Sequence, residues 1–543
     1  MMKRSVIIQR SQIGGQKADV SGRKSEDRRQ MSEARVQKSG ISVLTPRQSV
    51  ICHLSSKCIA KCLIAILLTL PWMSGSSQST EEITRLNLDA VIDWAQDASI
   101  SARRAATIQT TRYWEYRSFQ ANYKPQIQLN GTLPGFTRSF QEVTQQDGTV
   151  RFISVSNNNV NLGLSMSQPI ASTGGTVFLG TSLQRFDNFK DGAVFYNGSP
   201  IELGISQPLF AYNELKWDRK IEPLRFRESQ QEFIGNMEEI AQNTVDFFFN
   251  LLIAQTNFQI AQTNLVNTDT VYQITLEREK LGKASRNDVL QLRLETLKAK
   301  KSLASAQQDL AQARQQMSAY VGKPISADLL LELPELIPNV IVNPDRAIQE
   351  TMVNRPDAIG FLRRELEAKA AVAEAKGRRG FTASLVGAFG LSGSGAQLGQ
   401  VYTEAQDKES VFLQFNIPII DWGRAKSRLE TANAQQKLTI FEVEQDRVNL
   451  EQEVQTQVAL LGMFQQQLEL TKEADEVAAA RYKIAQDRFI LGDLSITDLS
   501  IALQENVQAK RDYIRSLWDF WQTHYYLRVL TLYDFEKQQK IKY

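Results

Sequence analysis

The strongest constraint on the fold is a short glycine-containing turn that occurs twice in the chain. Residues 281–288 (LGKASRND) and 491–498 (LGDLSITD) each end about 65 residues of helical pattern and open a second Leu- and Ala-rich helical run. One ungapped frame through matched features indicates an internal duplication whose unit is larger than a usual solenoid repeat. The offset of 210 positions also relates Pro208 to Pro418, Tyr212 to Trp422, Tyr272 to Tyr482, Ile274 to Ile484 and Asp288 to Asp498.

An apolar segment near the N-terminus has the layout of a secretory signal. Residues 62–70 are apolar apart from Thr69, with Lys57 and Lys61 before them and Pro71 and a Ser/Gly-rich stretch after them. The segment is too short to span a bilayer as a helix. The 56 residues upstream are rich in Arg, Ser and Gln. We interpret them as the result of a start site assigned too early, with a disordered regulatory arm as the alternative.

Cleavage near residues 76–80 would change the net charge and remove every cysteine. The whole chain has 63 basic and 60 acidic residues, and residues 1–80 hold 13 and 4 of them, so about −6 remains. The nominal charge of +3 is therefore no argument for nucleic acid binding. Because Cys52, Cys58 and Cys62 lie in the removed part, we expect no disulfide, thiolate chemistry, cysteine metal site or lipid anchor in the mature chain.

Alternating polar and apolar residues predict strands in both halves of the chain. A helix is expected over 87–120, capped by Asn87 and followed by aromatic residues before Pro125. The alternation then covers residues 126–131, 159–166, 176–183, 201–206, 381–391 and 411–417. A soluble sandwich has this pattern, and so does the wall of an outer-membrane barrel.

Long helices follow the strands in each half. They are predicted over about 215–281 and 425–491, and 65 residues at ~1.5 Å each make a rod of roughly 100 Å. Returning helices are expected over 287–321 and 497–530. A further helix is predicted over 344–376, which stacked end to end on 287–321 could match one long helix. Seven-residue spacing predicts a left-handed packing seam along Leu251, Phe258, Leu265 and Tyr272, and along Leu470, Val477, Ile484 and Leu491.

The sequence contains little that supports catalysis. The one histidine after residue 80, His524, lies among aromatic residues, so we interpret it as a packed or capping side chain. The Gly-rich stretch 390–395 lacks the context of a phosphate loop. Acidic residues are dispersed along helices with Lys and Arg, as on a solvated coiled-coil face. We therefore expect no enzyme, metal site or cofactor.

The turn residues have an ordinary structural interpretation. Gly282 and Gly492 suit the left-handed position at a helix C-terminus. Asp288 and Asp498 begin the returning helices, where a carboxylate can accept exposed N–H groups. Capping alone would explain these four residues. A functional role for the turns is suggested by their location, because both turns are expected at the same end of the rod.

This combination resembles the TolC family of outer-membrane efflux channels. The resemblance covers about residues 81–535 and is most specific at 278–290 and 488–499, and at the strand-to-helix joints 207–210 and 417–420. Pro125, Pro208 and Pro418 mark the joints. The resemblance implies an α+β membrane protein with an internal two-fold repeat. Three copies would form one outer-membrane β-barrel, to which each protomer adds two strand hairpins, and a periplasmic α-helical coiled-coil barrel would continue it.

The resemblance also implies a function and partners. The chain would be the passive exit duct of a tripartite efflux or type I secretion system. It would contact outer-membrane lipid, a periplasmic adaptor (membrane fusion protein) and an inner-membrane RND or ABC pump, but no nucleic acid. The residues expected to form the periplasmic turn and adaptor contact are Gly282, Lys283, Asp288, Gly492, Asp493 and Asp498. The substrate cannot be read from the sequence.

The expected domains follow from the repeat. Residues 1–80 form the N-terminal extension and signal peptide, 81–322 the first repeat, 323–343 a Pro-rich connector, 344–535 the second repeat and 536–543 a C-terminal tail.

The chain departs from the family pattern at the turn and in one insertion. Asp498 and Ile501 are the candidate pore constriction, where some members have two aspartates, and Leu494 replaces a latching arginine. Lys283 and Asp493 occupy matched positions of the two turns and have opposite charge, so we expect them to link neighbouring hairpins in the closed state. The stretch 137–197 adds two strands to the wall, giving six per protomer, or folds outside the membrane. The alternative function is a soluble periplasmic coiled-coil adaptor or scaffold.

Overall fold

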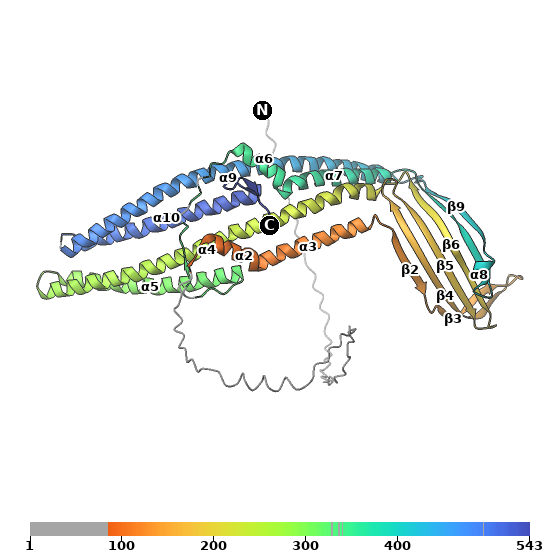
Figure 1. Ribbon diagram of the computed structural model, residues 1–543, viewed down its shortest axis with the longest axis horizontal. Coiled ribbons are helices and arrows are strands. Elements are labelled where there is room, and N and C mark those ends of the chain that lie inside the picture. The colour runs from red at the N-terminus through yellow and green to blue at the C-terminus, as the bar shows by residue number, and fades with distance from the viewer. Residues whose placement is uncertain (1–84, 327–328, 335–336, 339, 492) are drawn as a thin grey trace, which may run out of the picture. The chain divides into compact units, whose positions relative to one another are not determined.

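A computed structural model describes residues 85–326, 329–334, 337–338, 340–491 and 493–543. They belong to one compact unit. The predicted signal segment and all three cysteines lie outside the described residues. Within the unit, a sheet lies at one end of the long helices and the two turns lie at the other end (Figure 1).

Two long helical hairpins carry the turns. The first consists of α4 (Glu214–Lys280) and α5 (Arg286–Val321), and the second of α9 (Arg424–Leu491) and α10 (Ile496–Thr531). Both members of the second hairpin begin 210 positions after their counterparts in the first. The structure thus confirms the four predicted helices to within about one residue at each end.

Two helices predicted as continuous are broken in the structure. Ser99 separates α2 (Leu88–Ala98) from α3 (Ile100–Ala121), and its Oγ accepts a hydrogen bond from the Ala102 N–H at 3.0 Å. Arg355 separates α6 (Pro344–Asn354) from α7 (Pro356–Gly377). The residue before a proline avoids helical geometry, so Pro356 starts a new helix. The single helices 87–120 and 344–376 were therefore wrong predictions.

The predicted stacking of residues 344–376 on α5 is also wrong. α7 packs against α4 and α9, whereas α5 is met at its end by α2. Gly322 makes this meeting possible: it has a left-handed φ of 76°, and a Cβ there would lie 2.8 Å from the Ala98 carbonyl oxygen. α3 then continues along α4 toward the sheet.

The main hydrophobic core lies where α2, α4 and α10 meet. Its largest fully buried side chains include Phe248 and Phe249 of α4 and Leu517 and Phe520 of α10. Of the two predicted seven-residue stripes, the one in α4 begins at the buried Leu251. The stripe in α9 has no partner among the described residues, because Leu470, Val477, Ile484 and Leu491 are all 60–76% exposed.

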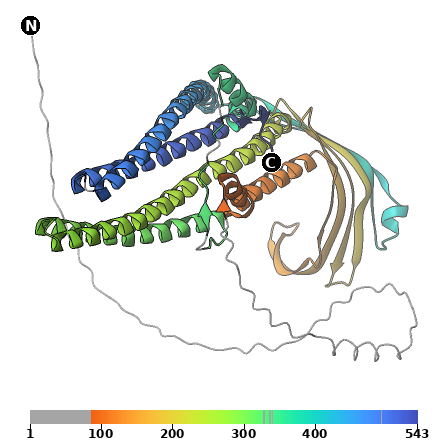
Figure 2. The same cartoon turned by 60° about the vertical axis from the view of Figure 1, so that its left-hand side comes forward.

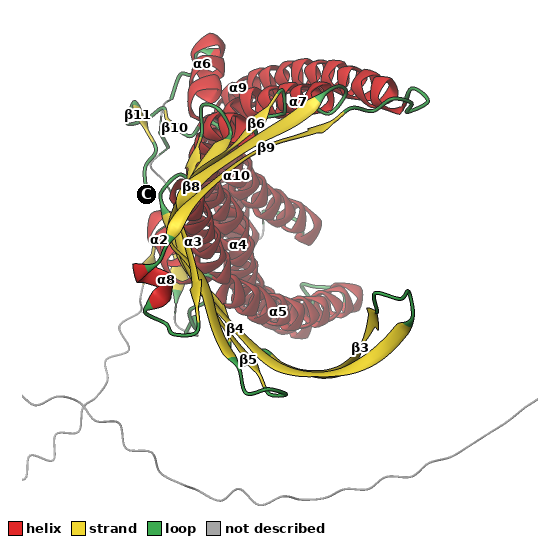
Figure 3. Cartoon of the chain, turned by 90° about the vertical axis from the view of Figure 1, so that its right-hand side faces the viewer, coloured by secondary structure: helices red, strands yellow, loops and turns green. Residues whose placement is uncertain are grey.

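One curved sheet contains all the long strands (Figure 3). Its path is β2-β4-β5-β6-β8-β9, with β3 also paired to β4, and every pair is antiparallel. The strands are β2 (Gln126–Thr132), β3 (Phe136–Thr144), β4 (Val150–Ile170), β5 (Gly175–Asn188), β6 (Val194–Leu209), β8 (Thr382–Gly395) and β9 (Gln406–Asn416).

This topology answers one question that the sequence left open and bears on a second. The long strands form a single layer, so the soluble sandwich is not formed by the described residues. The insertion 137–197 supplies β3, β4, β5 and the start of β6 to this same sheet, which is six strands wide because β2 and β3 share one edge of β4. The sequence prediction missed β3. A short helix, α8 (Gln400–Thr403), connects β8 to β9.

Two minor sheets complete the described part. β1 (Arg85–Leu86) pairs in parallel with β7 (Leu330–Leu331), and β10 (Tyr533–Asp534) pairs with β11 (Gln539–Lys540). None of the described helices combines the length and the apolar character needed to cross a membrane.

Candidate functional site

The first turn is built from a left-handed glycine and a reciprocal helix cap. Gly282 has φ 68°, and the Lys283 N–H donates to the Arg278 carbonyl at 2.8 Å. Ser285 Oγ accepts the Asp288 N–H at 3.1 Å, while the Asp288 carboxylate accepts the Ser285 N–H at 2.9 Å. These hydrogen bonds hold the pKa of Asp288 below its usual value. Asp288 therefore accepts an exposed N–H as predicted, but the N-cap residue is Ser285.

The second turn repeats this arrangement with one difference. The Asp493 N–H donates to the Arg488 carbonyl at 3.0 Å, and Ser495 Oγ accepts the Asp498 N–H at 3.2 Å. The Asp498 carboxylate accepts the Ser495 hydroxyl at 2.7 Å instead of a backbone N–H, so its predicted capping partner was wrong. Gly492 lies outside the described residues. Asp498 and Ile501 are both exposed.

The two hairpins lie side by side and touch near their turns (Figure 2). Arg278 of α4 donates to the Ile490 carbonyl of α9 at 3.4 Å and lies over the Phe489 ring. Farther from the turns, the Asn267 amide of α4 donates to the Tyr482 hydroxyl of α9 at 3.1 Å. Arg278 was not recognised from the sequence as a contact residue, because its partner is a backbone carbonyl about 210 positions away.

The expected pair of Lys283 and Asp493 does not form within one chain. In the described residues, neither side chain belongs to an ion pair. Both turns nevertheless lie at the same end of the helices (Figure 1). A groove of about 560 Å³ separates the hairpins above the turns, and its lining includes Asn264, Val271, Leu292, Tyr482, Leu499 and Leu503.

The sheet has one mainly apolar and one mainly polar face, with Glu409 of β9 as an exception on the first and Phe412 of β9 as an exception on the second. Cross-strand register places Ile127, Met166, Leu179, Leu203 and Phe389 in one row across five strands. Other exposed apolar side chains share this face, namely Leu129, Leu164, Ile205, Val411, Leu413 and Phe415. Because these residues are exposed in a single layer, the apolar face needs a nonaqueous or protein environment.

The opposite face of the sheet carries amides, hydroxyls and one ion pair. A hollow on this face is lined by Asn130, Asn161, Ser182, Gln184, Asn197, Ser199, Ser392 and Lys408. Lys408 of β9 reaches past β8 to the Glu202 carboxylate of β6. Gly390 lies between them in the register and has no side chain to interfere.

The three proline joints occupy different places. Pro125 lies between α3 and β2, and Pro418 follows the end of β9. Pro208 is still inside β6, paired with Ser384. The sequence Ser-Gln-Pro occurs at 167–169 and again at 206–208. In both places the side-chain amide of the glutamine, Gln168 or Gln207, donates to the carbonyl of the following proline, at 2.8 and 2.9 Å.

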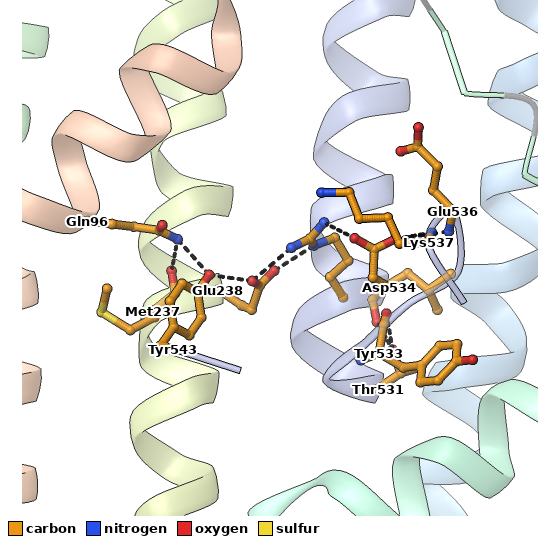
Figure 4. Close-up of polar contacts among 11 residues, drawn as sticks. Gln96, Met237, Glu238, Thr531, Tyr533, Asp534, Glu536, Lys537 and Tyr543 are labelled. Atoms are coloured by element: carbon orange, nitrogen blue, oxygen red, sulfur yellow. Dashed lines mark hydrogen bonds and ion pairs between the residues drawn. The ribbon is translucent and has the colours of Figure 1, made fainter. Parts of the chain in front are cut away.

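The buried polar groups serve packing. His524 is 5% exposed among Phe520, Trp521 and Tyr525, and burial lowers its pKa to about 4. Nearby, Glu238 of α4 is bound by Arg528 and Tyr543 (Figure 4). The described residues contain no group of three His, Cys, Asp or Glu side chains placed to hold a metal ion.

Comparisons with known proteins agree with this architecture. The family model for outer membrane efflux proteins matches residues 174–323 and 348–520, more than half of the chain. The probable outer membrane lipoprotein SilC of Salmonella typhimurium is 24% identical over 233 residues, 42% of this chain and 50% of SilC. The probable efflux pump outer membrane protein TtgC of Pseudomonas putida is 24% identical over 247 residues, 45% of this chain and 50% of TtgC. The chain thus spans about half the length of the curated relatives it matches.

Solved structures show the same fold at low identity. The outer-membrane channel OprN gives a TM-score of 0.60 at 16% identity, covering 83% of this chain and 90% of that one. The CmeC outer membrane channel of Campylobacter jejuni gives 0.60 at 13% identity, covering 84% and 87%.

Proposed function

Since the chain belongs to the outer membrane efflux protein family, we propose that it is the passive exit duct of a tripartite efflux or type I secretion system. Members of this family are outer-membrane channels and not enzymes, in agreement with the expectations from the sequence. The duct would pass substrates from an inner-membrane pump across the periplasm and the outer membrane.

The observation that carries the proposal is the two-faced, single-layered sheet at the end of long helices. An apolar face toward lipid and a polar face toward water are the requirements of a barrel wall. An open sheet cannot span a membrane, because its edges leave N–H and C=O groups unpaired. The edges must therefore be closed by other copies, and a homotrimer is the assembly we propose.

The helices would continue the duct into the periplasm. α4, of 67 residues, and α9, of 68, are each roughly 100 Å long at ~1.5 Å per residue. The equal offset between the two hairpins supports an internal duplication, with repeats over 81–322 and 344–535, a connector over 323–343 and the tail 536–543. Residues 1–80 would be the removed extension and signal peptide.

The turn end is the proposed entrance and adaptor contact. It includes Gly282, Lys283 and Asp288 of the first hairpin and their counterparts in the second, Gly492, Asp493 and Asp498. The exposed Asp498 and Ile501 are the proposed constriction. Lys283 and Asp493, which form no ion pair among the described residues, would pair between neighbouring copies and hold the closed entrance.

A charge exchange tests the closing pair. Lys283→Glu is expected to raise single-channel conductance in planar bilayers, Asp493→Lys to do the same, and the double variant to restore the closed state. Lys280→Glu is a matched control, because Lys280 pairs with Glu277 of its own helix. Unchanged conductance in both single variants would count against the pair without affecting the proposed duct.

A membrane extraction distinguishes the duct from its rival. The soluble adaptor or scaffold is less well supported, because it would leave the apolar sheet face in water. A detergent-extracted, heat-modifiable trimer from outer membranes is the expected result. Release of the protein by osmotic shock would overturn the proposed function. If the trimer is found, cross-linking from residues 282–288 and 493–498 would identify the adaptor.

A further inference from the structure

The two edges of the sheet are complementary in direction. β2 pairs only with β4, and β9 pairs only with β8, so each has one unpaired side. All pairs are antiparallel and the sheet is six strands wide, an even number, so β9 runs opposite to β2. β9 of one copy can therefore continue the ladder on β2 of a second copy in the same antiparallel sense.

The faces at these edges also match. Ile127 and Leu129 of β2 lie on the same face of the sheet as Val411, Leu413 and Phe415 of β9, and all five are exposed. Joining the edges keeps their apolar side chains on one surface. A shift of one residue would turn the apolar side chains of one strand to the opposite face. The pattern therefore allows only registers that differ from one another by an even number of residues.

The helices have edges on the same two sides. Near the turns the contacts run in the order α5, α4, α10, α9, and near the sheet they run α3, α4, α7, α9. The first-half elements α3 and α5 therefore share one edge with β2, and α9 shares the other with β9. One rotation between copies can bring both kinds of edge together.

The edge helices carry complementary stripes. Exposed Leu290, Leu294 and Leu297 lie at helical spacing on α5, and exposed Val477 and Ile484 lie seven residues apart on α9. Heptad-spaced apolar side chains pack against a neighbouring helix. The net charges beside the two stripes have opposite sign. Residues 293–301 of α5 carry four basic side chains and one acidic one (Glu295), and residues 469–476 of α9 carry four acidic side chains and one basic one (Lys472).

The heights of these charges agree. Lys300 follows Lys283 of the first turn by 17 residues, and Glu476 precedes Asp493 of the second turn by 17 residues. α5 leaves its turn while α9 approaches its own, so the two helices are antiparallel neighbours at equal distance from the entrance. Lys300 and Glu476 are therefore placed at the same level.

We propose that β9 and α9 of one copy bind β2 and α5 of a second copy, so that each copy contributes all six strands to the wall. With the three copies of the proposed function, on which this inference rests, the barrel has 18 strands. This differs from the two hairpins per protomer that the family resemblance implies. Barrels of 16–18 strands enclose an aqueous channel, so solute size would be limited at the turn end and not in the membrane.

Cysteine cross-linking in outer membranes tests which strand closes the wall. Leu129→Cys is combined in turn with Val411→Cys, Leu413→Cys and Phe415→Cys, since no native cysteine follows residue 62. Oxidation is expected to give covalent trimers on denaturing gels for at least one of these combinations. Lys300→Cys with Glu476→Cys tests the helix edge independently of the sheet.

Controls separate this inference from the proposed function. Thr181→Cys on β5, which is paired on both sides, combined with Leu413→Cys is expected to give no cross-linked species. Trimers that cross-link through Thr181 and never through Leu129 would show that β2 and β4 leave the wall, overturning six strands per copy while keeping the duct. The absence of any trimer on native gels would overturn both.

Discussion

Arg528 of α10 donates two hydrogen bonds to the Glu238 carboxylate of α4. Its Nε and Nη2 donate to the two carboxylate oxygens at 2.7 and 3.0 Å, and the Glu238 side chain is fully buried. Breaking such a pair by removing one partner leaves an uncompensated charge, at a cost of roughly 3–5 kcal/mol. Arg528→Met is therefore expected to lower the thermal midpoint of the detergent-solubilised protein markedly, measured by circular dichroism.

Two further variants identify the cause of this loss. Arg528→Met with Glu238→Met removes this pair but still leaves Asp534, the second carboxylate that Arg528 binds, without its partner, so partial recovery of the stability is expected. Arg515→Met on the same helix breaks an exposed pair with Asp519, for which about 0–1 kcal/mol is expected. Equal losses for Arg528→Met and Arg515→Met would contradict the importance of burial.

His524 predicts a pH dependence of stability. Burial, with a smaller effect of Arg528, lowers its pKa to about 4 from 6.5, while Asp534 acts in the opposite direction. The unfolded chain takes up a proton below pH 6.5, and the folded chain does so only near pH 4. Stability from this group is thus complete above pH 6.5 and lost progressively down to pH 4, by about 3 kcal/mol in total.

The measurement compares thermal midpoints at pH 7.5 and 5.0 in wild type and His524→Phe. The variant has no proton to bind, so its midpoint should fall less over this interval. A steeper fall in the variant than in wild type would mean that His524 is not neutral when folded. Asp288 contributes separately to the pH dependence of stability. Because hydrogen bonds lower the pKa of its carboxyl group, its contribution is present at neutral pH and is lost only as the pH falls through the acidic range.

Gly282 provides a test of the turn. An L-residue in the left-handed conformation costs roughly 1–2 kcal/mol, so Gly282→Ala should destabilise the turn by about that amount. Gly462→Ala is the matched control, because this glycine lies inside α9 with open space at the Cβ position. It should stabilise by roughly 0.5–1 kcal/mol. Hydrogen exchange of residues 276–290 reports the local effect, and unchanged exchange in Gly282→Ala would contradict the strain.

Ser285 can be tested separately. Ser285→Ala removes the N-cap hydrogen bond to Asp288 and is expected to cost ~1 kcal/mol, while Ser285→Asn should retain most of it. Faster exchange at the start of α5 in the alanine variant alone is the expected result.

The elements that the sequence predicted well are those fixed by local chemistry. The bounds of α4 and α5 follow from caps at Asn213, Ser285 and Gly322, which act on residues within one turn. The break at Ser99 was missed because a serine in a helical pattern is usually tolerated. β3 was missed because Arg138 and Glu142 interrupt the apolar face of that strand.

Long-range partners were the unpredictable part. Helical spacing showed that Leu470 and Ile484 form a stripe, but both side chains are exposed in the part of the chain that the structure describes, so no local pattern names their partner. The same limit applies to the site: Lys283 and Asp493 could be named from their turns, whereas the contact of Arg278 with the Ile490 carbonyl required the structure.

The ion pair of Lys408 with Glu202 predicts the ion selectivity of the proposed duct. Both side chains lie on the polar face of the sheet, which would line the lumen. Lys408→Gln leaves the Glu202 carboxylate uncompensated, so cation permeability relative to anion permeability should rise, roughly threefold for one charge at ~6 Å in water. Glu202→Gln should shift it the other way, and the double variant should resemble wild type. Reversal potentials under a salt gradient in planar bilayers measure this, with Lys190→Gln in the loop between β5 and β6 as the control. If Lys408→Gln and Lys190→Gln give the same reversal potential, the Lys408 face does not line the ion path.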